Sequence, residues 1–302
     1  MNSVYFTAGY AAFVLGILWL YVFVCRRSRQ ERTPFPEKTR LLRGPGESLR
    51  RKVSALDEAL LKEFLIACVA PATVLTVFLA LASKLEGAAG LLIANLGIVG
   101  LATTLYFCAR RIGAVVDRRR NTALGAFGER VVSEHLEPLK ASGHLVFHDV
   151  PAGDPPSGSR ATPFNLDHVV VGPAGVFAIE TKTRRKGPAR IGFMAHEIIY
   201  DGRALAYPWG EDRHGLEQAR SQAEWLARFL QQQLGQPVPV QPLLVFPGWT
   251  IIRKGQGAVD VLAPKEVPAA IAPAATRPAA LDAETMDLIA RQLEDRCRDV
   301  DL

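Results

Sequence analysis

The sequence predicts an α/β domain with a mixed central sheet flanked by helices in residues 122–302, preceded by a membrane anchor of three apolar helices in residues 1–110. Three observations predict this organisation. The first third of the chain contains long uncharged apolar segments, residues 166–183 form two β-branched runs around a Gly-Pro turn, and amphipathic helical stripes alternate with such runs up to the end of the chain.

Three apolar segments, 4–25, 64–83 and 87–109, have about the 20 residues that a bilayer core requires, and none has a charge in its interior. The first segment is not expected to be a cleaved signal peptide, because no basic residue precedes it and Arg26-Arg27 follows it in place of a small-residue cleavage site. We therefore expect three transmembrane helices and a lipid bilayer as a partner.

The basic residues predict the orientation of these helices. The connector 26–62 contains eleven Lys and Arg residues, whereas Lys84 is the single basic residue between the second and third segments. Because Lys and Arg accumulate in cytoplasmic loops, the N-terminus is expected outside and everything after Arg110 in the cytoplasm. The protein is thus expected in an inner or plasma membrane, with 111–121 as a juxtamembrane linker.

The net charge also divides along the chain. Residues 1–121 have a net charge of +9 and residues 122–302 a net charge of −3. The basic character belongs to the anchor and favours anionic lipid headgroups, and it is not by itself an indication of nucleic-acid binding. The four cysteines form no CxxC pair, so neither a disulfide framework nor a zinc ribbon is expected.

The later elements follow from periodicity and from Gly and Pro stop residues. The connector is expected to contain an amphipathic helix at 48–64 that leads into the second span. In the domain we expect helices at 122–140, 211–234 and 282–298, strands at 144–150, 166–172, 176–183, 196–201 and 240–246, and an Ala/Pro-rich connection at 263–280.

Several enzyme classes lack their sequence motifs here. The chain has no GxxxxGK[ST] phosphate loop, no GxSxG elbow, no HExxH and no GxGxxG after a strand. His168 follows Asp167 on a strand and is expected to face the opposite side, in a structural role.

The two runs at 166–172 and 176–183 predict a β-hairpin with charges at its open end. Glu180 and Lys182 are two apart and share a face of the strand, and Asp167 lies at the end of the neighbouring strand. Carboxylate oxygens and the Thr181 carbonyl suit Mg²⁺ or Mn²⁺, which activates water for phosphodiester hydrolysis. Lys182 would stabilise hydroxide and the developing phosphorane charge. By spacing alone, an ordinary charged strand rim explains the same pattern.

Glu129, on the helix expected at 122–140, completes the candidate set and could bind a second metal or a metal-bound water. With its surroundings, this stretch resembles a known family, the nuclease-related domain (NERD) family, which is placed in the PD-(D/E)xK nuclease superfamily with a restriction-endonuclease-like core. The resemblance covers residues 124–246 and rests on Gly128-Glu129, on the run from Leu166 to Lys182, and on Gln218-Ala219.

The resemblance implies that four charged residues form the active site, with Gln218 as a further polar position that contacts substrate. These residues are Glu129, Asp167, Glu180 and Lys182. The chain departs from the family pattern at Thr183, where Asn is frequent, and at His214-Gly215, where the family often has Asn-Pro. Neither departure changes the charged positions.

Two interpretations of the basic stretch after Lys182 remain open. Arg184 and Arg185 could bind the phosphates that flank a scissile bond, or they could form a solvated basic turn.

Two classes of function follow. The first is a membrane-anchored, metal-dependent nuclease that hydrolyses DNA or RNA on the cytosolic face. The alternative is a catalytically silent membrane-tethered adaptor or nucleic-acid-binding module that retains the nuclease fold, which the negative charge of 122–302 favours. A transporter is disfavoured, because no charge inside the three spans marks an ion path.

Overall fold

The computed structural model describes residues 16–17, 19–24, 39–153, 164–272 and 281–300. The chain divides into two units, residues 1–40 with 301–302, and residues 41–300. In the first unit, residues 16–17 and 19–24 are helical with exposed side chains. The rest of the first expected span, 4–25, lies outside the described residues.

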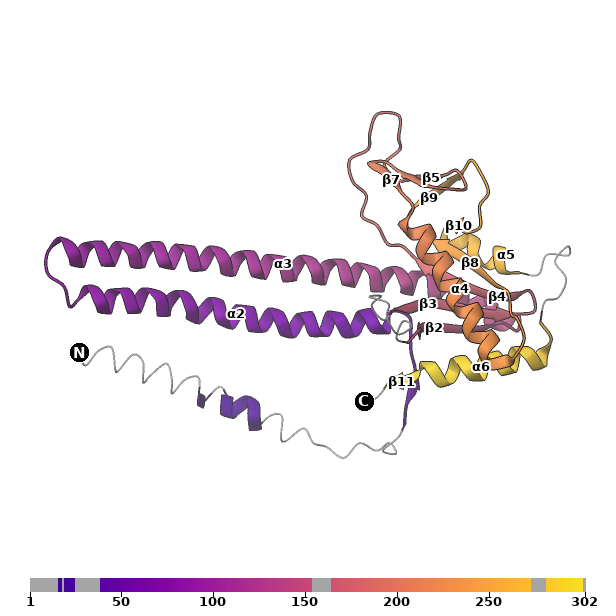
Figure 1. Ribbon diagram of the computed structural model, residues 1–302, viewed down its shortest axis with the longest axis horizontal. Coiled ribbons are helices and arrows are strands. Elements are labelled where there is room, and N and C mark those ends of the chain that lie inside the picture. The colour runs from indigo at the N-terminus through magenta and orange to yellow at the C-terminus, as the bar shows by residue number, and fades with distance from the viewer. Residues whose placement is uncertain (1–15, 18, 25–38, 154–163, 273–280, 301–302) are drawn as a thin grey trace. The chain divides into compact units, whose positions relative to one another are not determined.

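Two long helices form an antiparallel hairpin, α2 (Glu47–Ala82) and α3 (Ala88–Ala141), and lie side by side (Figure 1). The expected helix at 48–64 and the span at 64–83 are one continuous helix in the structure. Likewise, α3 joins the span at 87–109 to the helix at 122–140, so residues 111–121, expected as a linker, are helical.

The two helices approach closely where α3 has glycine. A Cβ on Gly97 would lie 2.6 Å from the Cβ of Phe78, and one on Gly100 would lie 2.9 Å from a methyl of Val74. Small residues at such contacts let two apolar helices pack backbone to backbone.

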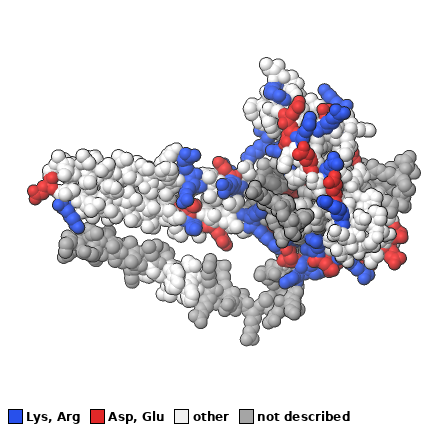
Figure 2. Space-filling view, in the orientation of Figure 1, with Lys and Arg blue, Asp and Glu red and all other residues white. Residues whose placement is uncertain are grey.

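Both helices are long and apolar enough to cross a membrane. The protein buries only 6% of the most apolar window of α2 and 11% of that of α3. Figure 2 shows a long stretch of the hairpin without charged side chains, between charges at its tip and charges toward the domain. Among the described residues, two helices of this kind are therefore found, where the sequence predicted three.

The domain is built on a five-stranded mixed sheet with the order β10-β8-β4-β3-β2. The strands β2, β3 and β4 are antiparallel, whereas β4, β8 and β10 are parallel. The hairpin predicted at 166–183 is confirmed as β3 and β4, with Gly172 opposite Gly175 at its turn. The five strands are β2 (Leu145–Pro151), β3 (Asn165–Gly172), β4 (Gly175–Thr181), β8 (Val240–Val245) and β10 (Asp260–Leu262).

Helices cover both faces of this sheet. On one face, α4 (His214–Leu234) and α6 (Ala283–Cys297) share a core with Val169 and Val171 of β3. On the other face, α5 (Val267–Ile271) and the C-terminal part of α3 pack against Phe177 and Ile179 of β4. The alternation of these buried side chains along the strands explains the three layers.

The expected Ala/Pro-rich connection at 263–280 is only partly a connection. A 3-10 turn (Pro264–Glu266) and α5 begin it, and Val267 and Ile271 are completely buried. Proline is compatible with the first positions of a helix. A Pro-rich composition therefore did not exclude the short core helix that the structure shows here. Residues 273–280 lie outside the described residues.

A second, four-stranded sheet has the order β7-β6-β5-β9 and lies beside the end of α4 (Figure 1). Three of its strands, of three or four residues each, were not expected from the sequence. Its strands are β5 (Glu197–Tyr200), β6 (Leu205–Tyr207), β7 (Gly210–Asp212) and β9 (Thr250–Arg253).

The segment before α2 is part of the domain. The short strand β1 (Leu41–Leu42) pairs with β11 (Arg298–Val300), which directly follows α6. Within the expected cytoplasmic connector 26–62, residues 41–43 therefore contact the C-terminal end of the domain.

Candidate active site

The hairpin of β3 and β4 fixes Asp167 at the open end of the sheet. Oδ2 of Asp167 accepts a hydrogen bond of 2.7 Å from the backbone N–H of Thr181, on the neighbouring strand. The antiparallel register that pairs His168 with Ile179 creates this contact. A carboxylate that accepts from the main chain of the next strand is held in one orientation.

Glu180 and Lys182 point to the same side, as their spacing predicted. The Glu180 side chain is 3% exposed, and its Oε1 lies 2.7 Å from Nζ of Lys182. Lys182 follows the last residue of β4, and its backbone N–H donates to the carbonyl of Val245 on β8, at 2.8 Å. The parallel pairing of β4 and β8 thus continues to the residue that carries the ammonium group.

The helix α4 supplies two amides to these charges. Nζ of Lys182 donates to Oε1 of Gln218 at 2.7 Å, so the structure brings the predicted polar position into the site. Gln222, one turn later, donates from Nε2 to Oε2 of Glu180 at 2.6 Å. Sequence reasoning missed Gln222, although its spacing of four from Gln218 puts both amides on one face of the helix.

Glu129 lies on α3 within range of the charges of Asp167 and Glu180, and the glycine before it explains the close approach of this helix. A Cβ on Gly128 would meet Oγ1 of Thr183 at 1.7 Å, so only glycine permits α3 to lie this close to the chain that follows Lys182. Glu129 is 6% exposed, and the backbone N–H of Gly46 lowers the pKa of its carboxyl group, against the larger effect of burial.

Burial and mutual repulsion keep two of the carboxyl groups protonated to unusually high pH. Burial, together with the charges of Asp149 and Glu180, raises the pKa of Glu129 to about 8. Burial also raises the pKa of Asp167 well above its ordinary value, and the charges of Glu180 and Glu129 add to this. Three carboxyl groups therefore influence one another here, with one ammonium group among them.

The donor set fits a hard divalent cation. Several buried oxygen atoms of the site have no hydrogen-bond partner in the described part of the chain: Oε2 of Glu129, Oγ1 of Thr181, Oγ1 of Thr183 and Oε1 of Gln222. Carboxylate, carbonyl and hydroxyl oxygens are the ligands that Mg²⁺ and Mn²⁺ prefer, and a cation would relieve the repulsion between the carboxylates.

The described residues do not, however, include a group of three or more His, Cys, Asp or Glu side chains arranged as a metal cluster. Both oxygens of Glu180 are bound to protein partners, Oε1 to Lys182 and Oε2 to Gln222. Mg²⁺ keeps several of its waters and needs only one or two carboxylates, which Asp167 and Glu180 could supply together with the Thr181 carbonyl.

The basic stretch after Lys182 is exposed. Arg184 forms an ion pair with Asp212 at 3.0 Å and lies over the ring of Tyr207, while Arg185 is exposed beside it. Trp249 donates from its indole N–H to the carbonyl of Arg184 at 3.2 Å, which holds the start of this stretch against the second sheet.

His168 is part of the sheet interior. Its Nδ1 lies 2.8 Å from Nδ1 of His148, which is its partner in the antiparallel register. Burial lowers the pKa of His148 to about 4 and the pKa of His168 well below 6.5, so both rings are neutral near pH 7. A neutral, paired and buried imidazole matches the structural role expected of His168.

Comparison with known proteins identifies a family whose model matches part of the chain. Searches of curated proteins and of solved structures found nothing that matches the chain. The family described as NERD, nuclease-related domain, matches residues 124–247, a span that includes every candidate site residue described above.

Proposed function

We propose that this protein is a metal-dependent nuclease that hydrolyses phosphodiester bonds of DNA or RNA and is held at a membrane by its apolar helices. The NERD match supports a nuclease-related function for residues 124–247. The observation that carries the proposal is the position of Lys182, whose ammonium group lies 2.7 Å from both Glu180 and Gln218 at the sheet end where Asp167 is fixed.

Asp167, Glu180 and the carbonyl of Thr181 would hold Mg²⁺ or Mn²⁺. When bound, such an ion supplies polarisation of a phosphoryl oxygen and lowers the pKa of a bound water. This donor set and the hairpin that carries it also support the restriction-endonuclease-like core that the family resemblance implies.

The protein's own groups have separate tasks in this proposal. Lys182 stabilises the negative charge that develops at the scissile phosphate, since its ammonium group is held by two partners and needs no reorganisation. Gln222 holds Oε2 of Glu180 in place. Glu129, with its pKa near 8, can hold or release a proton at its unpartnered Oε2 near neutral pH. Arg184 and Arg185 would bind the flanking phosphates.

The membrane part of the proposal rests on the hairpin of α2 and α3. Its apolar surface is hardly covered by the described protein, and large exposed apolar surfaces of soluble proteins are rare. The excess of basic residues in 26–62 favours an N-terminus outside and a catalytic domain in the cytoplasm. The first apolar segment, 4–25, would be the third span.

One observation favours the alternative, a silent nucleic-acid-binding adaptor. Both oxygens of Glu180 are already bound within the protein, an arrangement that is complete without a metal. A nuclease cleaves phosphodiester bonds at this site, whereas an adaptor binds nucleic acid without cleaving it.

The test is a cleavage time course with the full chain in detergent micelles, on supercoiled plasmid, single-stranded DNA and RNA, with Mg²⁺, Mn²⁺ or EDTA. Lys182→Ala is compared with Lys254→Ala, which removes an exposed lysine. We expect metal-dependent cutting that Lys182→Ala loses and Lys254→Ala retains. A folded wild-type chain that cuts none of the substrates would favour the adaptor.

A further inference from the structure

A buried carboxylate outside the candidate active site joins the start of the α2 helix to the sheet. Asp149 on β2 is 2% exposed, and its backbone has a φ of 49°, in the left-handed region that residues other than glycine seldom adopt. Its carboxylate accepts hydrogen bonds from Asn165, at 2.9 Å, and from both the backbone N–H and the hydroxyl of Ser48, at 2.7 Å each.

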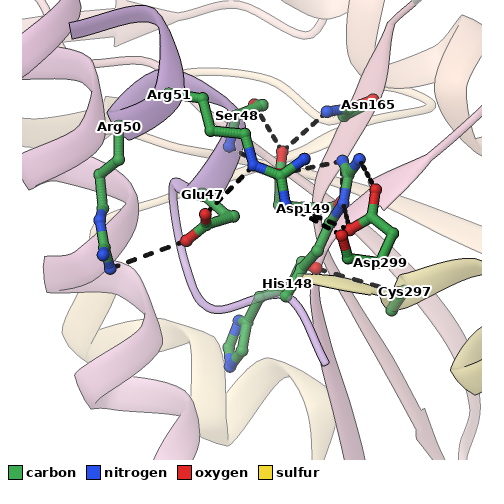
Figure 3. Close-up of polar contacts among 10 residues, drawn as sticks. Glu47, Ser48, Arg50, Arg51, His148, Asp149, Asn165, Cys297 and Asp299 are labelled. Atoms are coloured by element: carbon green, nitrogen blue, oxygen red, sulfur yellow. Dashed lines mark hydrogen bonds and ion pairs between the residues drawn. The ribbon is translucent and has the colours of Figure 1, made fainter. Parts of the chain in front are cut away.

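The contact with Ser48 provides a hydrogen-bond acceptor for the N-terminus of α2, which has no side-chain cap from its own segment. The N-cap of α2 is Gly46, and no side chain from its own segment accepts a hydrogen bond there. The first N–H groups of a helix need an acceptor, and a negative charge is favourable at this end. Asp149 supplies both from a strand that is a hundred residues away in the sequence (Figure 3).

Arg43 closes the same cluster from the other side. Its guanidinium binds the Asp149 carboxylate at 3.2 Å and the Asp299 carboxylate at 2.5 Å, and its backbone N–H donates to the carbonyl of Cys297 at 2.9 Å. The Arg43 side chain is only 11% exposed. Because it lies between two carboxylates, it fixes residues 41–48 against the domain. We call residues 41–48 the strap.

The strap continues from this cluster to the candidate active site. Gly46, with a φ of 68°, lies so close to α3 that a Cβ would be 3.2 Å from the Cα of Ala126. Its backbone N–H favours the charged form of the Glu129 carboxyl group, and Leu49, just after the strap, lies against Gly125. Residues before the second apolar segment thus contact the helical turn that presents Glu129.

We propose that the strap is a part of the active site, and that Arg43 and Asp149 are positioning residues that act on Glu129 through Gly46. This inference rests on the proposed nuclease function. It also implies that the domain from residue 122 onward is incomplete without residues 41–48, although the family match begins at residue 124.

The first experiment measures kcat and KM of the full chain in detergent micelles for Arg43→Ala and Gly46→Ala. Two variants are used because they act differently. Arg43→Ala removes the cation beside the buried Asp149 carboxylate, whereas Gly46→Ala acts at the contact with α3 and at a left-handed backbone position; circular dichroism verifies the fold of each. We expect kcat to fall roughly 10- to 100-fold with KM unchanged, as for a displaced catalytic group.

The matched control is Arg51→Ala. Arg51 binds Asp299 and Glu47 in the same cluster, but the described contacts of its side chain do not include Asp149 (Figure 3). This variant is expected to keep the wild-type kcat. An equal loss in Arg51→Ala and Arg43→Ala would overturn the proposal.

A double-mutant cycle separates positioning from general stabilisation. If Arg43 acts through Glu129, then Arg43→Ala causes no further loss of kcat in a Glu129→Gln chain. If the fold-losses of kcat in the two single variants multiplied in the double variant, the strap would act independently of Glu129, and the proposal would be overturned.

Hydrogen exchange provides a readout that does not depend on cleavage. Arg43→Ala should increase exchange in peptides that cover 41–49 and also in those that cover 124–132. An increase confined to 41–49 would overturn the coupling to Glu129. A wild-type chain that does not cut would defeat the proposed function and the catalytic role of the strap together, whereas an active wild type with fully active strap variants would defeat the strap alone.

Discussion

Gly128 and Thr183 lie so close together that a Cβ on Gly128 would be 1.7 Å from the Thr183 hydroxyl oxygen. This contact joins α3 to the chain directly after Lys182. This contact explains why Gly128 precedes Glu129 in the sequence. The glycine permits the close approach of α3, and the carboxyl group of the next residue, Glu129, is then buried beside the site. The contact also occurs at Thr183, one of the positions where the sequence departs from the pattern of the family that it resembles.

Gly128→Ala is therefore expected to push α3 away from the site. Overpacking of this kind costs about 1–3 kcal/mol of unfolding free energy, in spite of the better helix propensity of alanine. The displacement of Glu129 should also reduce cleavage. The thermal unfolding midpoint and the cleavage rate of the full chain in detergent measure the two effects.

Gly113→Ala is the control, in the same helix. A Cβ at Gly113 meets nothing within 4 Å, so alanine there should stabilise α3 by about 0.5–1 kcal/mol through helix propensity. If the two variants had the same unfolding midpoint, the close approach at Gly128 would be contradicted.

Gln222→Leu tests a residue that the sequence did not indicate. Leucine removes the amide donor from Oε2 of Glu180 and leaves that buried oxygen without its partner, which costs about 1–3 kcal/mol for a buried acceptor. We expect a lower kcat, because the Glu180 carboxylate is free to rotate away from its position beside Lys182. Gln232→Leu changes an exposed glutamine of the same helix and should have the wild-type kcat. Full activity of Gln222→Leu would exclude a role for this amide in catalysis.

The parts of the site that were predictable from the sequence are those set by local geometry. The β3–β4 hairpin follows from two β-branched runs around a Gly-Pro turn, and the shared face of Glu180 and Lys182 follows from the two-residue period of a strand. Both were confirmed, the second by the ion pair of 2.7 Å.

The parts that were missed depend on contacts between distant segments. Asp149 reaches Ser48 across about a hundred residues of sequence, and no local pattern indicates that a connector before an apolar helix belongs to the domain. The short strands β6, β7 and β9 offer too few residues for a period to be recognised. The region 111–121 was expected as a juxtamembrane linker between the third apolar segment and the domain, but charges on an exposed helix face are compatible with a continuous helix.

The pKa of Glu129 predicts how stability depends on pH in metal-free buffer. Its ordinary value of 4.5 applies to the unfolded chain, and its folded value is about 8. Between these values the folded protein binds a proton that the unfolded chain has released, so the free energy of unfolding falls as pH rises from 4.5 to about 8. The slope approaches about 1.4 kcal/mol per pH unit at most. The raised pKa of Asp167 acts in the same direction.

Glu129→Gln should make this dependence shallower, because glutamine does not titrate. Urea unfolding at several pH values between 5 and 8.5, in EDTA, measures the slope for each chain. Glu134→Gln, an exposed glutamate on the same helix, is the control and should keep the wild-type slope. An unchanged slope in Glu129→Gln would mean that this carboxyl group is ionised throughout the range.

Metal binding can be tested without any substrate. A cation that binds the folded state raises the free energy of unfolding by about 2.7 kcal/mol at a hundred times its dissociation constant, so Mn²⁺ should raise the unfolding midpoint of the full chain. The rise should be larger at pH 8 than at pH 6, because the cation competes with the protons that the raised pKa values of Glu129 and Asp167 retain. Asp167→Asn should abolish most of the rise, while Asp295→Asn, which changes an exposed residue of α6, should preserve it. An equal rise in Asp167→Asn would show that the cation binds elsewhere, and the buried oxygens around Glu180 would then need a different explanation.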